Sequence, residues 1–193
     1  MAAWAREFGA QYLDGAILAY PSHIGSTKAQ ILISGSVEAF SQHKELLKIL
    51  GTPVFVGQSP GAAAALDCAT LTSSIMASIA LIHGAALCES EGVEIAQLVS
   101  MVNARLPIRA ELNREIAEKI RTQRYDKPQS SVGTWAGVAK HFVHIAQENH
   151  LAHEVPRFVS QLLERAVARG LGDQEIASLI NIMRTDGIDK TNV

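Results

Sequence analysis

Residues 49–88 carry a single side chain with a formal charge, Asp67. The part of this stretch that follows Pro60 is made of small and apolar residues, contains no further proline, and lacks the alternation of a half-buried strand. Because proline is favourable in the first turn of a helix, the pattern predicts one long helix over about 60–88. Such a helix would be roughly 40 Å long. With so little charge, it has to be covered by lipid or by protein.

The composition of this helix favours protein as the cover. It is long enough to cross a bilayer, but it is rich in Ser, Thr, Ala and Gly and lacks basic or aromatic anchors at its ends. We therefore expect no membrane partner and a helix buried between packed neighbours. Cys68 and Cys88 would lie about 30 Å apart on it, which excludes a disulfide between them. Free thiols, and an N-terminus without the pattern of a signal peptide, predict a cytoplasmic protein.

The sequence falls into two parts with different secondary-structure patterns. Up to residue 57, strands are expected at 12–20, 29–35 and 52–57, with an amphipathic helix at 36–50 that Ser36 caps. After that, only helices are expected, and the shorter ones lie at about 93–104, 107–122, 134–149, 155–169 and 173–184, where Asp173 is a candidate N-cap. The sequence thus predicts a mainly α protein with domains at 1–57 and 58–193. Three strands cannot cover both faces of a sheet, so the first domain is expected to be the end of a larger α/β domain.

Asp67 supports two interpretations that the residues alone leave open. The carboxylate could form a structural ion pair with a cation from another segment, such as Arg105 or Arg109. Alternatively, it could be an acid in an apolar site, able to hold and donate a proton or to attract a cationic ligand.

Other candidate chemistries have weaker support. The net charge of −2 and the lack of a basic stripe exclude nucleic acid as an expected partner. The histidine pairs at 141/144 and 150/153 have no third ligand at a suitable spacing, so no metal is expected. No G-x-S-x-G and no G-x-G-x-x-G segment occurs, and cofactor-binding residues therefore cannot be assigned. Tyr125 and Trp135 flank a polar segment and could line a pocket mouth or simply pack between helices.

Three stretches resemble one enzyme family. YLDGAILAYPSHIGSTKAQILISGSVEAF, LGTPVFVGQSPGAAAALDCATL and the segment RYDKPQSSVGTWAGVAKHF with the helices after it are similar to the imine reductases and reductive aminases of the β-hydroxyacid dehydrogenase superfamily. The resemblance covers essentially the whole chain and keeps the order of the segments.

The resemblance also indicates the subfamily. Hydroxyacid dehydrogenases have a D-x-P-V-S-G-G strand end, but here Leu18 stands at the Ser position, and Ala19 and Tyr20 stand at the Gly positions. In their G-x-G-x-x-x-K-x-x-x-N segment, the catalytic Lys is matched here by Asp67 and the substrate-binding Asn by Leu71. These replacements disfavour a carboxylate substrate and favour an amine, an imine or an iminium cation.

The resemblance therefore implies NADPH-dependent reduction of C=N bonds, by imine reduction or reductive amination, with Asp67 as the catalytic acid. Leu18, Tyr20, Leu71, Trp135 and His144 are the candidate pocket residues. The chain would begin near the end of a Rossmann domain, so most of the NADPH site is expected to lie outside it. The 60–88 helix would link the domains, and the 6-phosphogluconate-dehydrogenase-like helices after it would form a domain-swapped homodimer. Two alternatives remain: a relative of the 3-hydroxyacid dehydrogenases and a non-catalytic helical dimerisation fragment.

Overall fold

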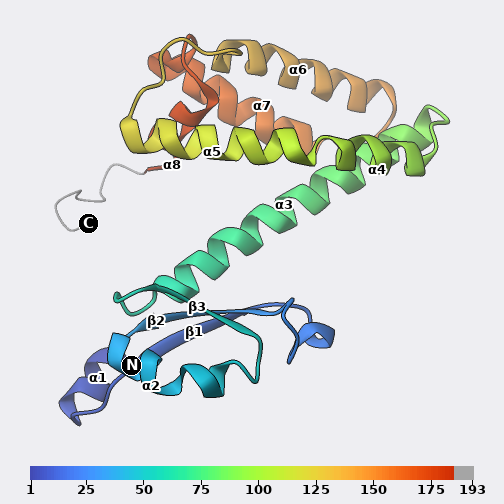
Figure 1. Cartoon of the computed structure of the whole chain (residues 1–193). Coiled ribbons are helices and arrows are strands. Elements are labelled where there is room, and N and C mark those ends of the chain that lie inside the picture. The colour runs from blue at the N-terminus through green and yellow to red at the C-terminus, as the bar shows by residue number, and fades with distance from the viewer. Residues whose placement is uncertain (185–193) are drawn as a thin grey trace. The chain divides into compact units, whose positions relative to one another are not determined.

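A computed structural model describes residues 1–184 and has the expected mainly α fold with a small three-stranded sheet (Figure 1). It contains two compact units, Met1–Ser78 and the described part of Ile79–Val193. The boundary between the units lies within the long helix α3 (Ala62–Ser90). The boundary after residue 57 stays a prediction from the sequence.

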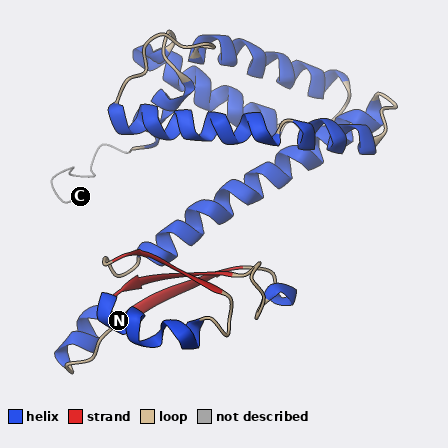
Figure 2. Ribbon diagram, in the orientation of Figure 1, coloured by secondary structure: helices blue, strands red, loops and turns tan. Residues whose placement is uncertain are grey.

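The first unit is built around the sheet, with strand order β1-β2-β3. β1 is antiparallel to β2, and β2 is parallel to β3 (Figure 2). All three predicted strands and the helix between the last two are present, and the Ser36 hydroxyl accepts the capping hydrogen bond from the Ala39 N–H. The elements in chain order are α1 (Ala2–Glu7), β1 (Leu13–Leu18), a 3-10 turn (Pro21–His23), β2 (Gln30–Gly35), α2 (Val37–Leu47) and β3 (Thr52–Gly57).

The two faces of the sheet have different partners. Ile31 and Ile33 point to the face that α2 covers, where Phe40 and Phe55 pack with ring centroids 5.1 Å apart. Because side chains alternate along a strand, Leu32 and Ser34 point to the opposite face. The first turn of α3 meets that opposite face (Figure 1). The sheet is therefore sandwiched between α2 and the start of α3.

Most of α3 is exposed within the described chain. Ala63 is its only buried residue, and large side chains such as Leu71 and Ile82 are 53% and 69% exposed. An 18-residue window of this helix has a mean hydropathy of 1.7 and no buried residue, so its length and composition alone would allow it to cross a membrane. The described residues of the single chain therefore leave most of α3 uncovered, and its burial between packed neighbours stays a prediction.

The second unit is a helical bundle. Its core lies between α6 and α7 and consists of Val132, Ala136, Ala139, Leu163, Ala166 and Ile182. The elements after α3 are α4 (Ile95–Ala104), α5 (Leu106–Thr122), α6 (Val132–Glu148), α7 (Glu154–Ala166), a π turn (Val167–Leu171), a 3-10 turn (Ile176–Leu179) and α8 (Ile180–Met183).

The helix predicted at 173–184 is broken, and Asp173 does not cap it. The carbonyls of Gly172 and Gln174 accept hydrogen bonds from Gly133 and Val132 at the start of α6, and Glu175 forms a β-bridge with Ser131. These contacts interrupt the predicted helix: Glu175 is extended, and helical turns begin only at Ile176.

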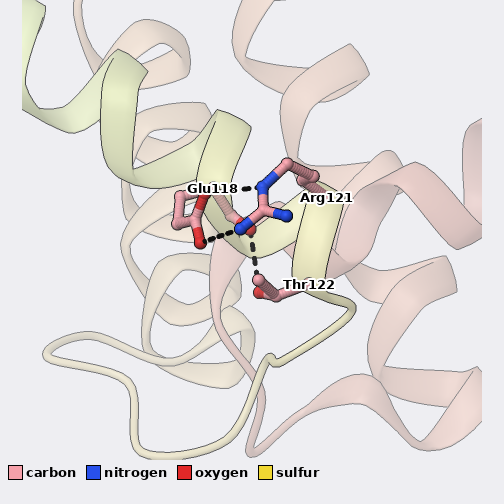
Figure 3. Close-up of polar contacts among 3 residues, drawn as sticks. All are labelled: Glu118, Arg121 and Thr122. Atoms are coloured by element: carbon pink, nitrogen blue, oxygen red, sulfur yellow. Dashed lines mark hydrogen bonds and ion pairs between the residues drawn. The ribbon is translucent and has the colours of Figure 1, made fainter.

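Helix α5 has an exposed ion pair near its C-terminal end (Figure 3). The Arg121 guanidinium donates to both oxygens of the Glu118 carboxylate, at 2.9 and 2.7 Å, and the Thr122 hydroxyl donates to the Glu118 carbonyl. The Arg121 side chain lowers the pKa of Glu118, first through these hydrogen bonds and then through its charge. The pair is a feature of a solvated helix face rather than of a binding site.

Candidate active site

The start of α3 is anchored to the sheet by side chains from distant parts of the sequence. The first N–H groups of a helix have no partner within the helix. Here Ala62 donates to the Ser59 carbonyl, Ala63 donates to the Ser34 hydroxyl at 3.1 Å, and Ala64 donates to the Asp14 carboxylate at 3.2 Å. The residue that precedes the helix, Gly61, has no side chain with which to cap it. The sheet supplies the missing acceptors.

Asp14 and Ser34 are paired across the β1–β2 ladder. They lie directly opposite each other in the antiparallel register, so their side chains share one face of the sheet. Ser34 is fully buried, whereas Asp14 is half-buried. This pair receives two consecutive N–H groups of α3, and the carboxylate lies at the positive end of the helix dipole.

Asp67 lies one turn beyond this anchor. It follows Ala64 by three residues, a rise of about 4.5 Å along the helix. Its side chain is half-buried, and within residues 1–78 no ion pair engages its carboxylate. An ion pair with Arg105 or Arg109 would join the two units and stays a prediction. Within its own unit, the carboxylate is available to a ligand.

The other candidates in the first unit have different positions. Leu71 follows Asp67 by four residues, so the two share a face of α3. Leu18 has the same strand parity as Asp14, so it lies on the α3 side of the sheet, about 13 Å further along β1. Tyr20 lies beyond the end of β1, is 76% exposed, and has its ring 5.8 Å from that of His23.

Trp135 and His144 both belong to α6 but do not share a face of it. His144 follows Trp135 by nine residues, or two and a half helical turns, which places the two on opposite sides of α6 and about 13.5 Å apart along its axis. Trp135 is 42% exposed. His144 borders a surface hollow of about 260 Å³ between α6 and α7, together with Lys140, Val143, Arg157, Ser160, Gln161 and Glu164. On this geometry the two residues cannot line the same wall of one pocket.

The carboxyl ends of the parallel strands β2 and β3 form the edge where α/β sheets bind their ligands. A depression of about 340 Å³ lies there, with Arg6, Tyr12, Glu38 and Gln58 among its lining residues. Glu38 has a lowered pKa because its own backbone N–H, and then the Ser36 hydroxyl, hydrogen-bond to its carboxylate. Among the described residues, no group of three potential ligands is arranged to hold a metal ion.

Sequence reasoning missed the roles of Asp14 and Ser34. Each is a polar residue between an apolar residue and a glycine in its strand, and the register places the two directly opposite each other. A correctly predicted hairpin register would therefore have paired Asp14 with Ser34. It would not have revealed that both side chains contact the start of α3.

Comparison with known proteins places this chain in a family. The sequence pattern described as "NADPH-dependent reductive aminase-like, C-terminal domain" matches residues 59–185, which is more than half of the chain. The chain belongs to this reductive aminase-like family.

The relatives agree with that assignment. The NADPH-dependent reductive aminase of Aspergillus oryzae is 26% identical over 188 residues, which are 95% of this chain and 64% of that protein. A reductive aminase from Aspergillus terreus, solved with NADPH and ethyl levulinate, is 29% identical with a TM-score of 0.84 over 95% of this chain and 64% of its own. An imine reductase from Myxococcus stipitatus, solved with NADP+, is 25% identical and has a TM-score of 0.85. The match covers 94% of this chain and 64% of that protein. The chain thus spans less than two thirds of these relatives.

Proposed function

We propose that this chain provides the substrate-side half of the active site of an NADPH-dependent enzyme that reduces C=N bonds. The observation that carries the proposal is Asp67, a half-buried carboxylate with no ion pair in its own unit, on the first turns of α3. It stands where hydroxyacid dehydrogenases have lysine. An anionic or neutral acid suits a basic nitrogen, whereas lysine suits a substrate carboxylate.

In this mechanism the Asp67 carboxyl binds the C=N nitrogen and provides the proton that the nitrogen gains as its carbon is reduced. NADPH, when bound, supplies the hydride to that carbon. Leu71 lies one turn further along the same face of α3, and its side chain helps to exclude water from the reacting bond. Leu18 lines the α3 side of the sheet, where hydroxyacid dehydrogenases place a carboxylate-binding serine. Tyr20, which lies beyond the end of β1, and Trp135 and His144, which belong to the second unit, are secondary candidates.

The residues of this chain fit only part of NADPH. Gly57 and Gly61 flank the loop that leads into α3, both have positive φ, and an added Cβ would meet no atom within 4 Å at either. This open backbone loop at the carboxyl edge of the sheet is the part of the chain that would face the nicotinamide end. No glycine-rich phosphate loop occurs in the sequence, so we derive no contact to the pyrophosphate.

We also propose that the exposed face of α3 is covered by a second copy of the chain, in the cytoplasm. Scattered apolar residues on a surface are ordinary, but a continuous apolar helix needs a partner. Its Asp67, its hydroxyl residues and His83, whose Nε2 lies 3.1 Å from the Ala152 carbonyl oxygen, fit a protein interface better than lipid. Light scattering should give twice the 20.7 kDa chain mass without detergent. A monomer, or a protein soluble only in detergent, would contradict this.

Two other functions remain to be separated from the first. A 3-hydroxyacid dehydrogenase relative would bind a hydroxy acid near residue 67, and a dimerisation fragment would bind neither substrate class. Titration of the isotope-labelled chain with pyrrolidinium chloride and, separately, with sodium 3-hydroxybutyrate distinguishes all three by the shifts of its amide NMR signals.

We expect pyrrolidinium to shift the signals of Asp67 and Leu71 and Asp67→Asn to abolish that response. Cys68→Ser, at the adjacent exposed position, is the matched control and should keep it. A response to 3-hydroxybutyrate alone would favour the dehydrogenase relative. No response to either compound would favour the dimerisation fragment.

A further inference from the structure

The anchor at the start of α3 has a consequence for the site. The two side-chain acceptors come from 29 and 50 residues away, on adjacent strands, and they bind consecutive N–H groups. The first turn of α3 is therefore tied to the sheet at two neighbouring points, which fixes both its position and its rotation about the helix axis. A helix capped only by its own preceding residue would have no such tie.

Rotation of this turn decides where the Asp67 carboxyl points. A residue three positions after Ala64 lies on nearly the same side of the helix, so a change in the orientation of the first turn carries Asp67 with it. Catalytic groups lose efficiency when they are displaced by as little as about 1 Å. The anchor thus acts on the geometry of Asp67 without touching a substrate.

We propose that Asp14 and Ser34 are positioning residues for the Asp67 carboxyl, a role that rests on the function proposed above. Asp14 is the more informative of the two, because an asparagine keeps the acceptor oxygen and loses only the charge. Asp14→Asn should therefore preserve the anchor, whereas Asp14→Ala should release the Ala64 N–H. Ser34→Ala removes the other acceptor and serves as a second variant should Asp14→Ala not fold.

The first measurement is amide hydrogen exchange in the full chain, followed by NMR. Asp14→Ala should speed exchange at Ala64 and through the turn that contains Asp67 by about tenfold, a size within the range of helix-cap losses. Exchange at the buried strand residues Ile31 and Ile33 should stay within about twofold, because a local release leaves the sheet intact. Asp14→Asn should restore slow exchange. Unchanged exchange in Asp14→Ala and Ser34→Ala, or equal acceleration throughout the sheet, would overturn the proposal.

The second measurement is pyrrolidinium affinity, read from the Asp67 amide signal. We expect Asp14→Ala to weaken it at least threefold and Asp14→Asn to restore it. Faster exchange without weaker binding would reduce Asp14 to a structural cap and overturn its positioning role. If Asp67→Asn itself leaves pyrrolidinium binding unchanged, the proposed function fails, while the exchange result still decides whether the anchor exists.

Discussion

The Ser34 hydroxyl, at the end of β2, accepts a hydrogen bond from the Ala63 N–H at the start of α3, across 29 residues of sequence. Both residues are fully buried. A buried N–H that loses its partner incurs a desolvation cost, so this contact stabilises the junction between sheet and helix more than an exposed bond would.

Ser34→Ala should therefore lower the free energy of unfolding by about 1–2 kcal/mol. Urea unfolding followed by far-UV circular dichroism measures the change. The matched control is Ser41→Ala, because Ser41 is exposed and donates to the Val37 carbonyl within its own helix. The control should change stability by no more than about 0.5 kcal/mol. Equal effects of the two substitutions would mean that the Ser34 contact has no special weight.

Gly35, next along β2, cannot accept a side chain. Its φ is +120°, and a Cβ there would overlap the Tyr12 carbonyl oxygen, which already accepts a hydrogen bond from Ser36. Gly35→Ala should cost about 3 kcal/mol or more, from backbone strain and steric overlap together. Thermal unfolding provides the measurement.

Gly9→Ala separates the two causes. Gly9 also has a positive φ, but an added Cβ would meet no atom within 4 Å. Gly9→Ala should therefore lower the free energy of unfolding only by the backbone strain, about 1 kcal/mol. Similar losses at the two glycines would contradict the close approach of Tyr12 to Gly35.

The Glu118–Arg121 pair predicts a pH effect of known sign. The pKa of Glu118 is lowered in the folded protein from its ordinary value of 4.5. The stabilisation that ionised Glu118 contributes to the folded state is therefore complete above pH 4.5. It is lost as the pH falls through the lower pKa of the folded protein. In Arg121→Ala, carboxyl NMR titration should find the pKa of Glu118 closer to 4.5, with that of Glu38 unchanged. A Glu118 titration that does not respond would mean that the pair does not persist in solution.

Local patterns were enough to predict the strands and most helices. Ser36 directly precedes an amphipathic run, and its capping bond lies within four residues, so the sequence pattern and the structure agree. The long helix could be predicted for the same reason: an unbroken apolar run without internal proline has few other conformations.

Features that depend on distant contacts could not be predicted in this way. The caps of α3 come from Asp14 and Ser34, and no local pattern reveals which strand residues a later helix will meet. Likewise, contacts between residues 172–175 and the start of α6 interrupt the predicted helix and override the local signal of Asp173. The described chain leaves most of α3 uncovered, so the expected burial of this helix stays a prediction that depends on a second molecule. The uncharged stretch around Asp67 was enough to identify this residue, but only the resemblance to a motif favoured a catalytic acid over a structural ion pair.

The most direct test of the account is turnover of a cyclic imine by the NADPH-loaded protein. The assay should use this chain, which spans 64% of the Aspergillus oryzae reductive aminase, and, in parallel, the chain joined to an N-terminal cofactor-binding domain from that relative. Asp67→Asn should reduce kcat by about 100-fold or more, the scale of general acid catalysis, whereas Cys68→Ser should stay within about twofold. An Asp67→Asn rate above half that of the unsubstituted protein, or no turnover by either unsubstituted form, would contradict the account.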